Sequence, residues 1–241
     1  MARQGKGPAP TADGRSTRWD SHREARREEL VEAAIRAIDE HGQNAGIAEV
    51  AAAAGVSKPV LYRYFTGKDD LYRAVGQWGA QHVLDGLIPA LLSDLPIRER
   101  VRAAMDAYLT FIDDHQAVFL LLVDHRPDTA GDPLEEGKEM IAAAIARTFG
   151  DMLRRLGVDA AGAEPWAHGM VGFGMTSGEW WLRRRTMSKS AMGTYLSDFI
   201  WYAFHGIAKS YGVDVDEQGQ LHLSVVEPVA ITPSRRSRKD A

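Results

Sequence analysis

The sequence predicts an all-α protein of about nine helices, with a small N-terminal domain followed by a larger helical one. Three observations predict this fold class. Apolar residues recur at helical spacing, no stretch beyond residue 76 alternates as a β-strand would, and glycines and prolines divide the chain into segments of helix length. With 241 residues, of which 45% are hydrophobic and 26% charged, the chain is long enough to bury a core in each domain.

The N-terminal domain is expected at residues 21–67. Residues 1–20 are rich in Gly, Pro, Ala and Thr, and we expect a disordered arm there. A first helix is expected from Ser21, because Ser21 and Glu24 have the spacing of a capping box, and Gly42 follows its end. Helical spacing gives this helix a buried face: Leu30, Val31, Ala34, Ile35 and Ile38.

Residues 45–64 predict a helix, a three-residue corner and a second helix that would enter a DNA groove. Gly55 supplies the left-handed backbone that a sharp corner needs. Ser57 would cap the second helix, and Pro59 fits its first turn, where a missing N–H costs nothing. The outer surface of this second helix, which would read the DNA, carries Lys58, Pro59, Val60, Tyr62 and Tyr64.

The run VAAAAGVSKPVLYRYFTGKDDLYRAV, followed by a long helical remainder, resembles the TetR family of bacterial transcriptional regulators. The matching stretch extends from Arg26 to Val75, and one departure is Gly46, where the family usually has a capping Ser or Thr. The resemblance implies DNA binding by Ser57, Lys58, Pro59, Val60, Tyr62, Tyr64 and Lys68. Among them, Lys58, Pro59 and Val60 would reach base edges, and Tyr62, Tyr64 and Lys68 would lie near phosphates.

Charge is unevenly distributed along the chain, whose formal net charge is −4. Residues 1–27 hold seven basic and three acidic side chains, whereas the chain from residue 76 onward holds 17 basic and 22 acidic ones. A local basic patch is what binding to phosphates requires, and the acidic balance falls on the part that need not contact DNA.

The composition also bounds location and chemistry. The sequence has no cysteine, so disulfides and thiolate metal sites are excluded. The N-terminus lacks the apolar segment of a signal peptide, and the apolar run Phe119–Val123 is too short to span a bilayer. The glycines of GMVGFGMTSGEWW lie inside a helical pattern with no preceding strand, so no nucleotide loop is predicted. We expect a cytoplasmic protein with no membrane contact, no cofactor and no metal.

Residues 68–212 are expected to form an effector-binding and dimerisation domain, and residues 213–241 a mostly disordered tail in which LHLSVVEPV has an extended pattern. Breaks at prolines and glycines place its helices near 69–92, 98–114, 116–124, 134–156, 164–186 and 189–211.

The last two of these helices carry apolar stripes at helical spacing. Such a stripe is typical of an ordinary core, but under the family resemblance it indicates a homodimer interface that would align two reading helices with a palindromic operator. The interface residues expected on this basis are Phe173, Trp181, Met192, Leu196, Phe199 and Ala203.

The middle helices are rich in large, soft side chains, many of which must belong to the core. The resemblance implies a cavity for a small effector among these helices, and methionine and aromatic side chains suit an apolar ligand. The expected lining is Met105, Tyr108, Phe111, Phe119, Met152 and Trp166, with Glu179, His115, His125 or His168 as polar anchors.

Two other function classes remain open at this stage. The acidic and histidine residues between Asp113 and His125 could serve a hydrolase or a metal enzyme, although they match no H-E-x-x-H motif and the sequence has no serine elbow. A helical scaffold that does not bind DNA would leave the exposed basic and tyrosine residues without a purpose. We therefore expect a ligand-responsive regulator, not an enzyme: a repressor that binds its operator as a homodimer and is released by a small apolar effector.

Overall fold

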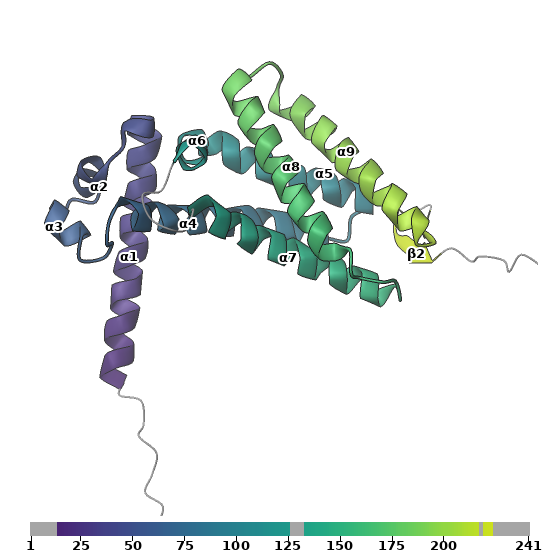
Figure 1. Ribbon diagram of the computed structural model, residues 1–241, viewed down its shortest axis with the longest axis horizontal. Helices are drawn as coiled ribbons and strands as arrows, with labels where there is room; N and C mark the ends of the chain where they lie inside the picture. The colour runs from purple at the N-terminus through teal and green to yellow at the C-terminus, as the bar shows by residue number, and fades with distance from the viewer. Residues whose placement is uncertain (1–13, 126–132, 217–218, 224–241) are drawn as a thin grey trace, which may run out of the picture.

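The structure, a computed structural model, describes residues 14–125, 133–216 and 219–223. Within these residues it contains nine α-helices, one turn of 3-10 helix and two short strands, which confirms the predicted all-α fold class (Figure 1). The expectations of disorder for residues 1–13 and 224–241 lie outside the described residues.

The helices are α1 (Gly14–His41), α2 (Ile47–Ala53), α3 (Lys58–Leu61), α4 (Lys68–Leu92), α5 (Ile97–Asp114), α6 (Gln116–Asp124), α7 (Pro133–Arg155), α8 (Ala163–Arg184) and α9 (Lys189–Ser210). The 3-10 turn is Gly42–Asn44 and the strands are β1 (Val213–Val215) and β2 (Leu221–Leu223). For α4 to α9, every predicted end lies within two residues of the observed one. Proline and glycine breaks therefore located these helices well.

The first helix is longer than predicted. It begins at Gly14 and not at Ser21, so residues 14–20 are helical where a disordered arm was expected. No glycine or proline lies between Arg15 and His41, and nothing in this stretch interrupts the helix once it has begun. The capping-box spacing at Ser21 was therefore misleading.

The chain beyond α9 forms a β-hairpin that the sequence analysis did not predict. β1 and β2 pair antiparallel, with Val213 opposite Leu223. Gly212 and Gly219 have φ angles of +71° and +74°, a left-handed backbone that glycine adopts at no steric cost. Each strand has only three residues, too few for an alternating pattern to stand out in the sequence.

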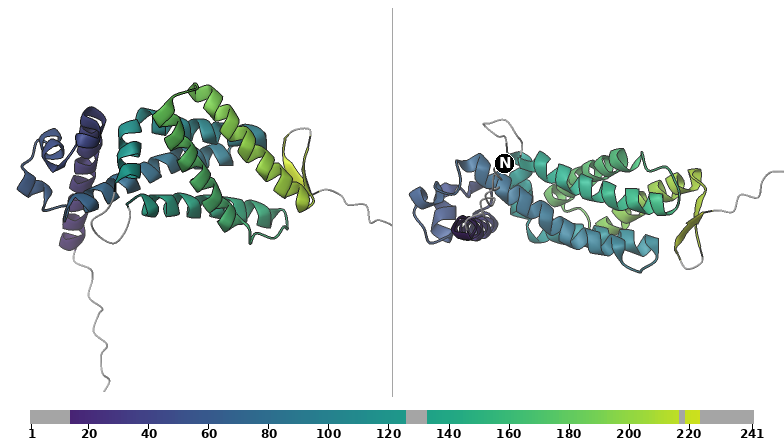
Figure 2. Two further views of the ribbon diagram at one scale, coloured as in Figure 1. Left: turned by 45° about the horizontal axis from the view of Figure 1, so that its top comes forward. Right: turned by 90° about the horizontal axis from the view of Figure 1, so that it is seen from below.

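The buried apolar residues form two cores, and α4 contributes to both. Figure 1 shows α4 running from the α1–α3 part of the molecule into the bundle of α5 to α9. The first core joins α1, α2, α3, the start of α4 and α6, and includes Leu30, Ile38, Val50, Leu61, Phe65, Leu71 and Val118. The second core joins the rest of α4 with α5 to α9, and includes Leu87, Leu109, Ile112, Ile145, Phe149, Trp181 and Leu196. Figure 2 shows the β-hairpin at the end of the molecule opposite α2 and α3.

Candidate functional site

The corner between α2 and α3 has the geometry that the sequence predicts. Gly55 has a φ of +64°, and the Val56 N–H donates to the Ala51 carbonyl over 2.9 Å. At the start of α2, Glu49 makes the reciprocal half of a capping box, because its Oε2 accepts from the Gly46 N–H over 2.9 Å, while Gly46 has no side chain for the other half. Hydrogen bonds from the Glu49 and Gly46 backbone N–H groups hold the pKa of the Glu49 carboxyl below its usual value.

The residues expected to bind DNA lie on and around α3, with differing exposure. Ser57, Lys58, Pro59, Tyr62 and Lys68 are exposed, whereas Val60 and Tyr64 are partly buried and Tyr64 packs against the first core. Ser57 occupies the N-cap position of α3, but its side chain accepts no capping hydrogen bond. The predicted cap is therefore wrong in that detail, and the Ser57 hydroxyl is not used by the helix.

Lys68, the first residue of α4, is positioned by an aromatic ring. Its Nζ lies 5.1 Å from the centroid of the Tyr72 ring, and the Tyr72 hydroxyl donates to the Ala45 carbonyl over 3.0 Å. Burial, with a smaller contribution from the charge of Glu49, raises the pKa of Tyr72 to about 12, so the phenol stays a hydrogen-bond donor at neutral pH. The lysine is thus held beside the start of α2, at the edge of the surface that is expected to read DNA.

Arg27 of α1 links the segment after α3 to the start of α4. Its guanidinium lies 4.6 Å from the centroid of the Phe65 ring and donates to Asp70 Oδ1 over 2.8 Å. Asp70 Oδ2 accepts from the Thr66 N–H over 2.9 Å. Burial acts to raise the pKa of the Asp70 carboxyl, but the hydrogen bonds from Thr66 and Arg27 outweigh it and hold that pKa below the usual 3.8.

The short helix α6 connects the two cores. Its Val118, Leu121 and Leu122 belong to the first core, and its Phe119 to the second. A helix that is apolar on all sides is buried on all sides, and the sequence QAVFLLLVD carried this signal. The segment was expected to be a helix with Phe119 in the effector lining, and its burial between two cores was not predicted.

Histidines at both ends of α6 contact the N-terminal helices. His115 Nδ1 lies 3.2 Å from Asp39 Oδ2 on α1, and His125 Nε2 lies 3.0 Å from Asp69 Oδ1 on α4. The His125 ring also packs edge-on against Tyr72, with 4.9 Å between centroids. Both ends of α6 are therefore tied to the part of the molecule that presents Lys68.

The C-terminal end of α8 is tied to the same short helix. Arg183 donates to Asp124 over 2.5 Å, and Arg185 donates to Asp113 over 2.7 Å and to Gln116 over 2.9 Å. These pairs are largely exposed, so each contributes at most about 1 kcal/mol to stability. Their importance lies in position, because they link α8 to both ends of α6.

The same contacts account for the acidic and histidine residues considered for catalysis. Asp113, His115, Asp124 and His125 are divided between the two ends of α6, roughly 13 Å apart for a helix of this length, and each is engaged with a neighbouring helix. In the described part of the chain, no three His, Cys, Asp or Glu residues converge as a metal site would require. These residues connect helices.

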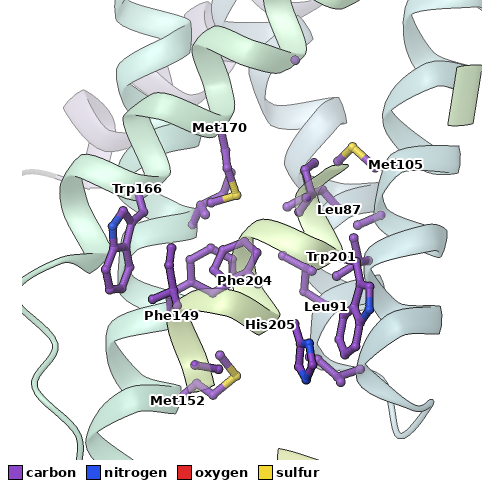
Figure 3. Close-up of a pocket in the computed structure, with 18 of the residues that line it drawn as sticks. Leu87, Leu91, Met105, Phe149, Met152, Trp166, Met170, Trp201, Phe204 and His205 are labelled. Carbon is purple, nitrogen blue, oxygen red and sulfur yellow. The ribbon is translucent and has the colours of Figure 1, made fainter. Parts of the chain in front are cut away.

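An apolar cavity lies within the second core, between α4, α5, α7, α8 and α9 (Figure 3). It has a volume of about 130 Å³, whereas one water needs roughly 10–15 Å³ on the same measure, so the space is large enough for a ligand. Four residues of the expected lining do line it: Met105, Tyr108, Met152 and Trp166. The β-hairpin closes one end with Val213, Val215 and Leu221.

Two residues of the expected lining lie elsewhere. Phe111 packs against the Trp78 ring, with 5.8 Å between centroids, and Phe119 is buried in the second core. The four polar anchors that the sequence suggested do not line the cavity either. His205 lines it, although it was not predicted to do so from the sequence. The spacing of Trp201, Phe204, His205 and Ala208 on one face of α9 was the available signal.

The expected subunit interface divides into buried and exposed residues. Trp181, Met192 and Leu196 are buried within the second core, whereas Phe199 is 60% exposed and Ala203 is also exposed. Phe173 stacks on Phe199, with 4.5 Å between ring centroids. Three further exposed aromatic side chains extend this face of α8 and α9: Trp180, Tyr195 and Tyr202.

Comparison with known proteins agrees with this geometry. A family model described as bacterial regulatory proteins, tetR family, matches residues 30–75, and one described as Tetracyclin repressor-like, C-terminal domain, matches residues 86–212. The chain belongs to the TetR family. It is a transcriptional regulator of that type, with a helix-turn-helix for DNA binding, and the resemblance seen in the sequence is confirmed.

Two curated relatives resemble this TetR-family chain over most of its length. It is 32% identical to the HTH-type transcriptional regulator Rv0472c of Mycobacterium tuberculosis over 224 residues, which cover 92% of this chain and 96% of the relative. It is also 32% identical to the HTH-type transcriptional activator FasR of Mycolicibacterium smegmatis over 181 residues, or 74% of this chain and 83% of the relative.

Solved structures show the same fold at lower identity. A tetR-family transcriptional regulator from Streptomyces coelicolor superposes with a TM-score of 0.62 at 24% identity, covering 78% of this chain and 83% of that one. The regulator FadR of Bacillus subtilis, solved in complex with stearoyl-CoA, gives a TM-score of 0.55 at 13% identity, covering 72% of this chain and 96% of that one.

Within the described residues of this chain, no helix combines the length and apolarity needed to cross a membrane.

Proposed function

We propose that this regulator is a cytoplasmic repressor that binds a palindromic operator as a homodimer and is released from it by an apolar effector. The observation that carries the proposal is the physical connection between two sites. α4 begins at Lys68 on the DNA-reading surface and contributes Val83, Leu87 and Leu91 to the cavity wall. A ligand that favours one position of α4 over another would therefore change the orientation of the reading surface.

The DNA-binding residues that we propose are Ser57, Lys58, Pro59, Val60, Tyr62, Tyr64 and Lys68. The exposed Lys58 and Pro59 at the start of α3 support base contacts, since a reading helix uses its N-terminal residues for base edges. The exposed Tyr62 and Lys68 flank α3 and support phosphate contacts.

A homodimer is supported by the aromatic face on α8 and α9, which includes Phe199. Aromatic side chains are enriched at interfaces, and a cluster of large exposed ones is unusual on a free surface. Phe199→Glu should dissociate the dimer without unfolding the protomer, because the side chain is exposed before assembly and a buried unpaired charge opposes assembly. Leu92→Glu, at an exposed position at the end of α4, is the matched control. Light scattering that shows an intact Phe199→Glu dimer would exclude this face.

We propose a long-chain acyl compound as the effector. The cavity is bounded by hydrocarbon, sulfur and aromatic surfaces, which suit a flexible apolar chain. The cavity wall on α5 extends from Ile97 to Tyr108, roughly 16 Å at 1.5 Å per residue, a length along which a hydrocarbon chain can lie. The FadR structure with stearoyl-CoA shows that a protein of this fold binds such a compound.

Activation is a second candidate for the direction of control, because the FasR relative is named an activator. The two directions differ in what the effector does to operator binding. Fluorescence anisotropy with DNA from upstream of the chain's own coding sequence, with and without stearoyl-CoA, tests the proposal. Release of DNA by stearoyl-CoA supports the repressor, tighter binding supports the activator, and no binding of any upstream DNA contradicts both. A Lys58→Ala and Lys68→Ala double variant is the control for binding through the proposed surface.

A further inference from the structure

Few side chains in the cavity wall carry a nitrogen or oxygen atom: Tyr108, Trp166, Trp201 and His205. The Tyr108 hydroxyl already donates to the Gly174 carbonyl over 2.8 Å. The two indole N–H groups can donate but cannot accept. Among the lining groups without a hydrogen-bond partner in the described residues, His205 offers two ring nitrogens, whereas each indole offers a single N–H (Figure 3).

The ring of His205 is held in place, while its nitrogens have no partner within the described residues. It stacks on the Trp201 ring one turn earlier in α9, with 5.3 Å between centroids and 9° between planes. No hydrogen bond or ion pair joins either imidazole nitrogen to another described residue. The described residues also contain no side-chain nitrogen or oxygen that is sealed from solvent without a partner, so these nitrogens remain accessible. A fixed ring with available nitrogens has the properties of a ligand anchor.

The position of His205 gives the cavity two unlike ends. His205 lies toward the C-terminal end of α9, where the chain continues into the hairpin that closes the cavity with Val213 and Leu221. Tyr108 lies eleven residues into the cavity wall from Ile97, and its hydroxyl is already bonded. The hairpin end of the cavity therefore has a polar group with no partner within the described residues, whereas the polar group at the opposite end is already committed.

From this asymmetry we propose that His205 binds the carbonyl or carboxylate oxygen of a long-chain acyl ligand, with the hydrocarbon chain directed toward Tyr108. The inference rests on the proposed function, because it names the chemical class of the effector and the residue that recognises its head group. A purely hydrocarbon ligand would leave this imidazole without a hydrogen-bond partner, whereas an acyl oxygen would supply one.

The test compares three probes that share an eighteen-carbon chain: stearate, stearoyl-CoA and octadecane. Each is supplied from cyclodextrin and competes with an environment-sensitive apolar dye for the purified full-length protein. His205→Phe keeps an aromatic ring beside Trp201 but removes the nitrogens, and His205→Gln keeps a donor and an acceptor. His82→Phe is the matched control, because His82 also packs on an indole ring, that of Trp78 at 4.1 Å, but lies outside the cavity.

We expect His205→Phe to weaken the binding of stearate or stearoyl-CoA by about 10- to 100-fold, which corresponds to the loss of a hydrogen bond to a charged or strongly polar group. The affinity for octadecane should not change. His205→Gln should recover most of the loss, and His82→Phe should have no effect. If His205→Phe loses affinity for stearate alone, the head group is a free carboxylate. If it loses affinity for stearoyl-CoA, the head group is the thioester carbonyl.

Equal weakening of all three probes by His205→Phe would overturn the inference, because it would show a packing role. Unchanged affinity for all three would also overturn it and place the head group elsewhere, while the proposed acyl effector would stand. If the wild-type protein binds none of the probes, both the anchor and the acyl effector are rejected. Operator binding, measured separately by anisotropy, then decides whether the protein is a DNA-binding regulator, independently of the effector.

Discussion

The two cores of the molecule differ in how completely they are filled. The first core closes around Leu30, Leu61 and Phe65, each 1% exposed, and fixes α1, α2 and α3 against the start of α4. The second core is larger and contains the cavity, with half-buried Met105, Met152 and Met170 at its wall. Under the proposed function, the enclosed side chains of the first core would give a rigid support for DNA reading, whereas soft side chains around a cavity would let the second core change shape with a ligand.

The helix α6 connects the two unlike cores, because it contributes side chains to both of them. Under the proposed function, a movement in the second core would reach α6 through Phe119 and through the pairs that Arg183 and Arg185 make at its two ends. The contacts of His115 and His125 with α1 and α4 would then pass this movement to the proposed reading surface. We therefore propose α6, beside the predicted α4, as a coupling route.

The largest expected effect is on the free energy of unfolding, and two substitutions compare this effect between the two cores. Phe65→Ala should cost about 3–5 kcal/mol in the free energy of unfolding, because the ring is fully enclosed and the site cannot collapse. Met152→Ala should cost only about 1–2 kcal/mol, because this half-buried side chain already borders empty space. Urea denaturation measures both values. Equal costs would show that the two cores are packed alike.

The next effect separates base reading from phosphate binding on the surface that the first core supports. Lys58→Ala should lose about 1–3 kcal/mol of discrimination at one or two base pairs. Lys68→Ala should weaken binding to all sequences alike and reduce the salt dependence by about one phosphate contact. Anisotropy titrations with operator variants at several salt concentrations provide both readouts. An unchanged salt slope in Lys68→Ala would place this lysine away from the DNA.

A smaller effect is expected from cutting the link between α6 and α1. The double variant Asp39→Ala and His115→Ala should reduce the coupling between effector and operator by roughly 0.5–2 kcal/mol, because a mutation along a coupling route changes coupling on this scale. The control removes Asp151 and Arg154, an exposed pair at 2.6 Å within α7. Coupling that is the same in both variants would exclude this contact from the route.

The smallest effect concerns acid stability of the first core. The pKa of Asp70 is lowered in the folded protein, so its stabilising contribution is present above the unfolded value of about 3.8 and is lost as pH falls through the folded value. Asp70→Asn should therefore destabilise the protein by about 1 kcal/mol at pH 7. The difference from wild type should shrink below pH 3.8. A difference that is constant with pH would show that the charge of Asp70 is unimportant.

The contrast between the cores also explains what the sequence could predict. The α2–α3 corner depends on neighbours such as Gly55 and Pro59, so a local pattern was enough to locate it. The cavity wall is assembled from five helices and the hairpin, and helical spacing does not show that Phe111 points away from it. Spacing groups His205 with Trp201 and Phe204 on one face of α9, but it does not show that this face lines a cavity. For the same reason, spacing could not separate the buried Trp181 from the exposed Trp180.

The central claim is that the cavity and the DNA-reading surface are energetically coupled, and one calorimetric measurement tests it most directly. Stearoyl-CoA is titrated into the protein alone and into the protein saturated with its operator DNA. Linkage requires that a ligand which releases DNA be released by DNA to the same extent, so we predict a 5- to 150-fold weaker affinity with operator present, or roughly 1–3 kcal/mol. Equal affinities in the two titrations would contradict the coupling, even if the protein binds both partners.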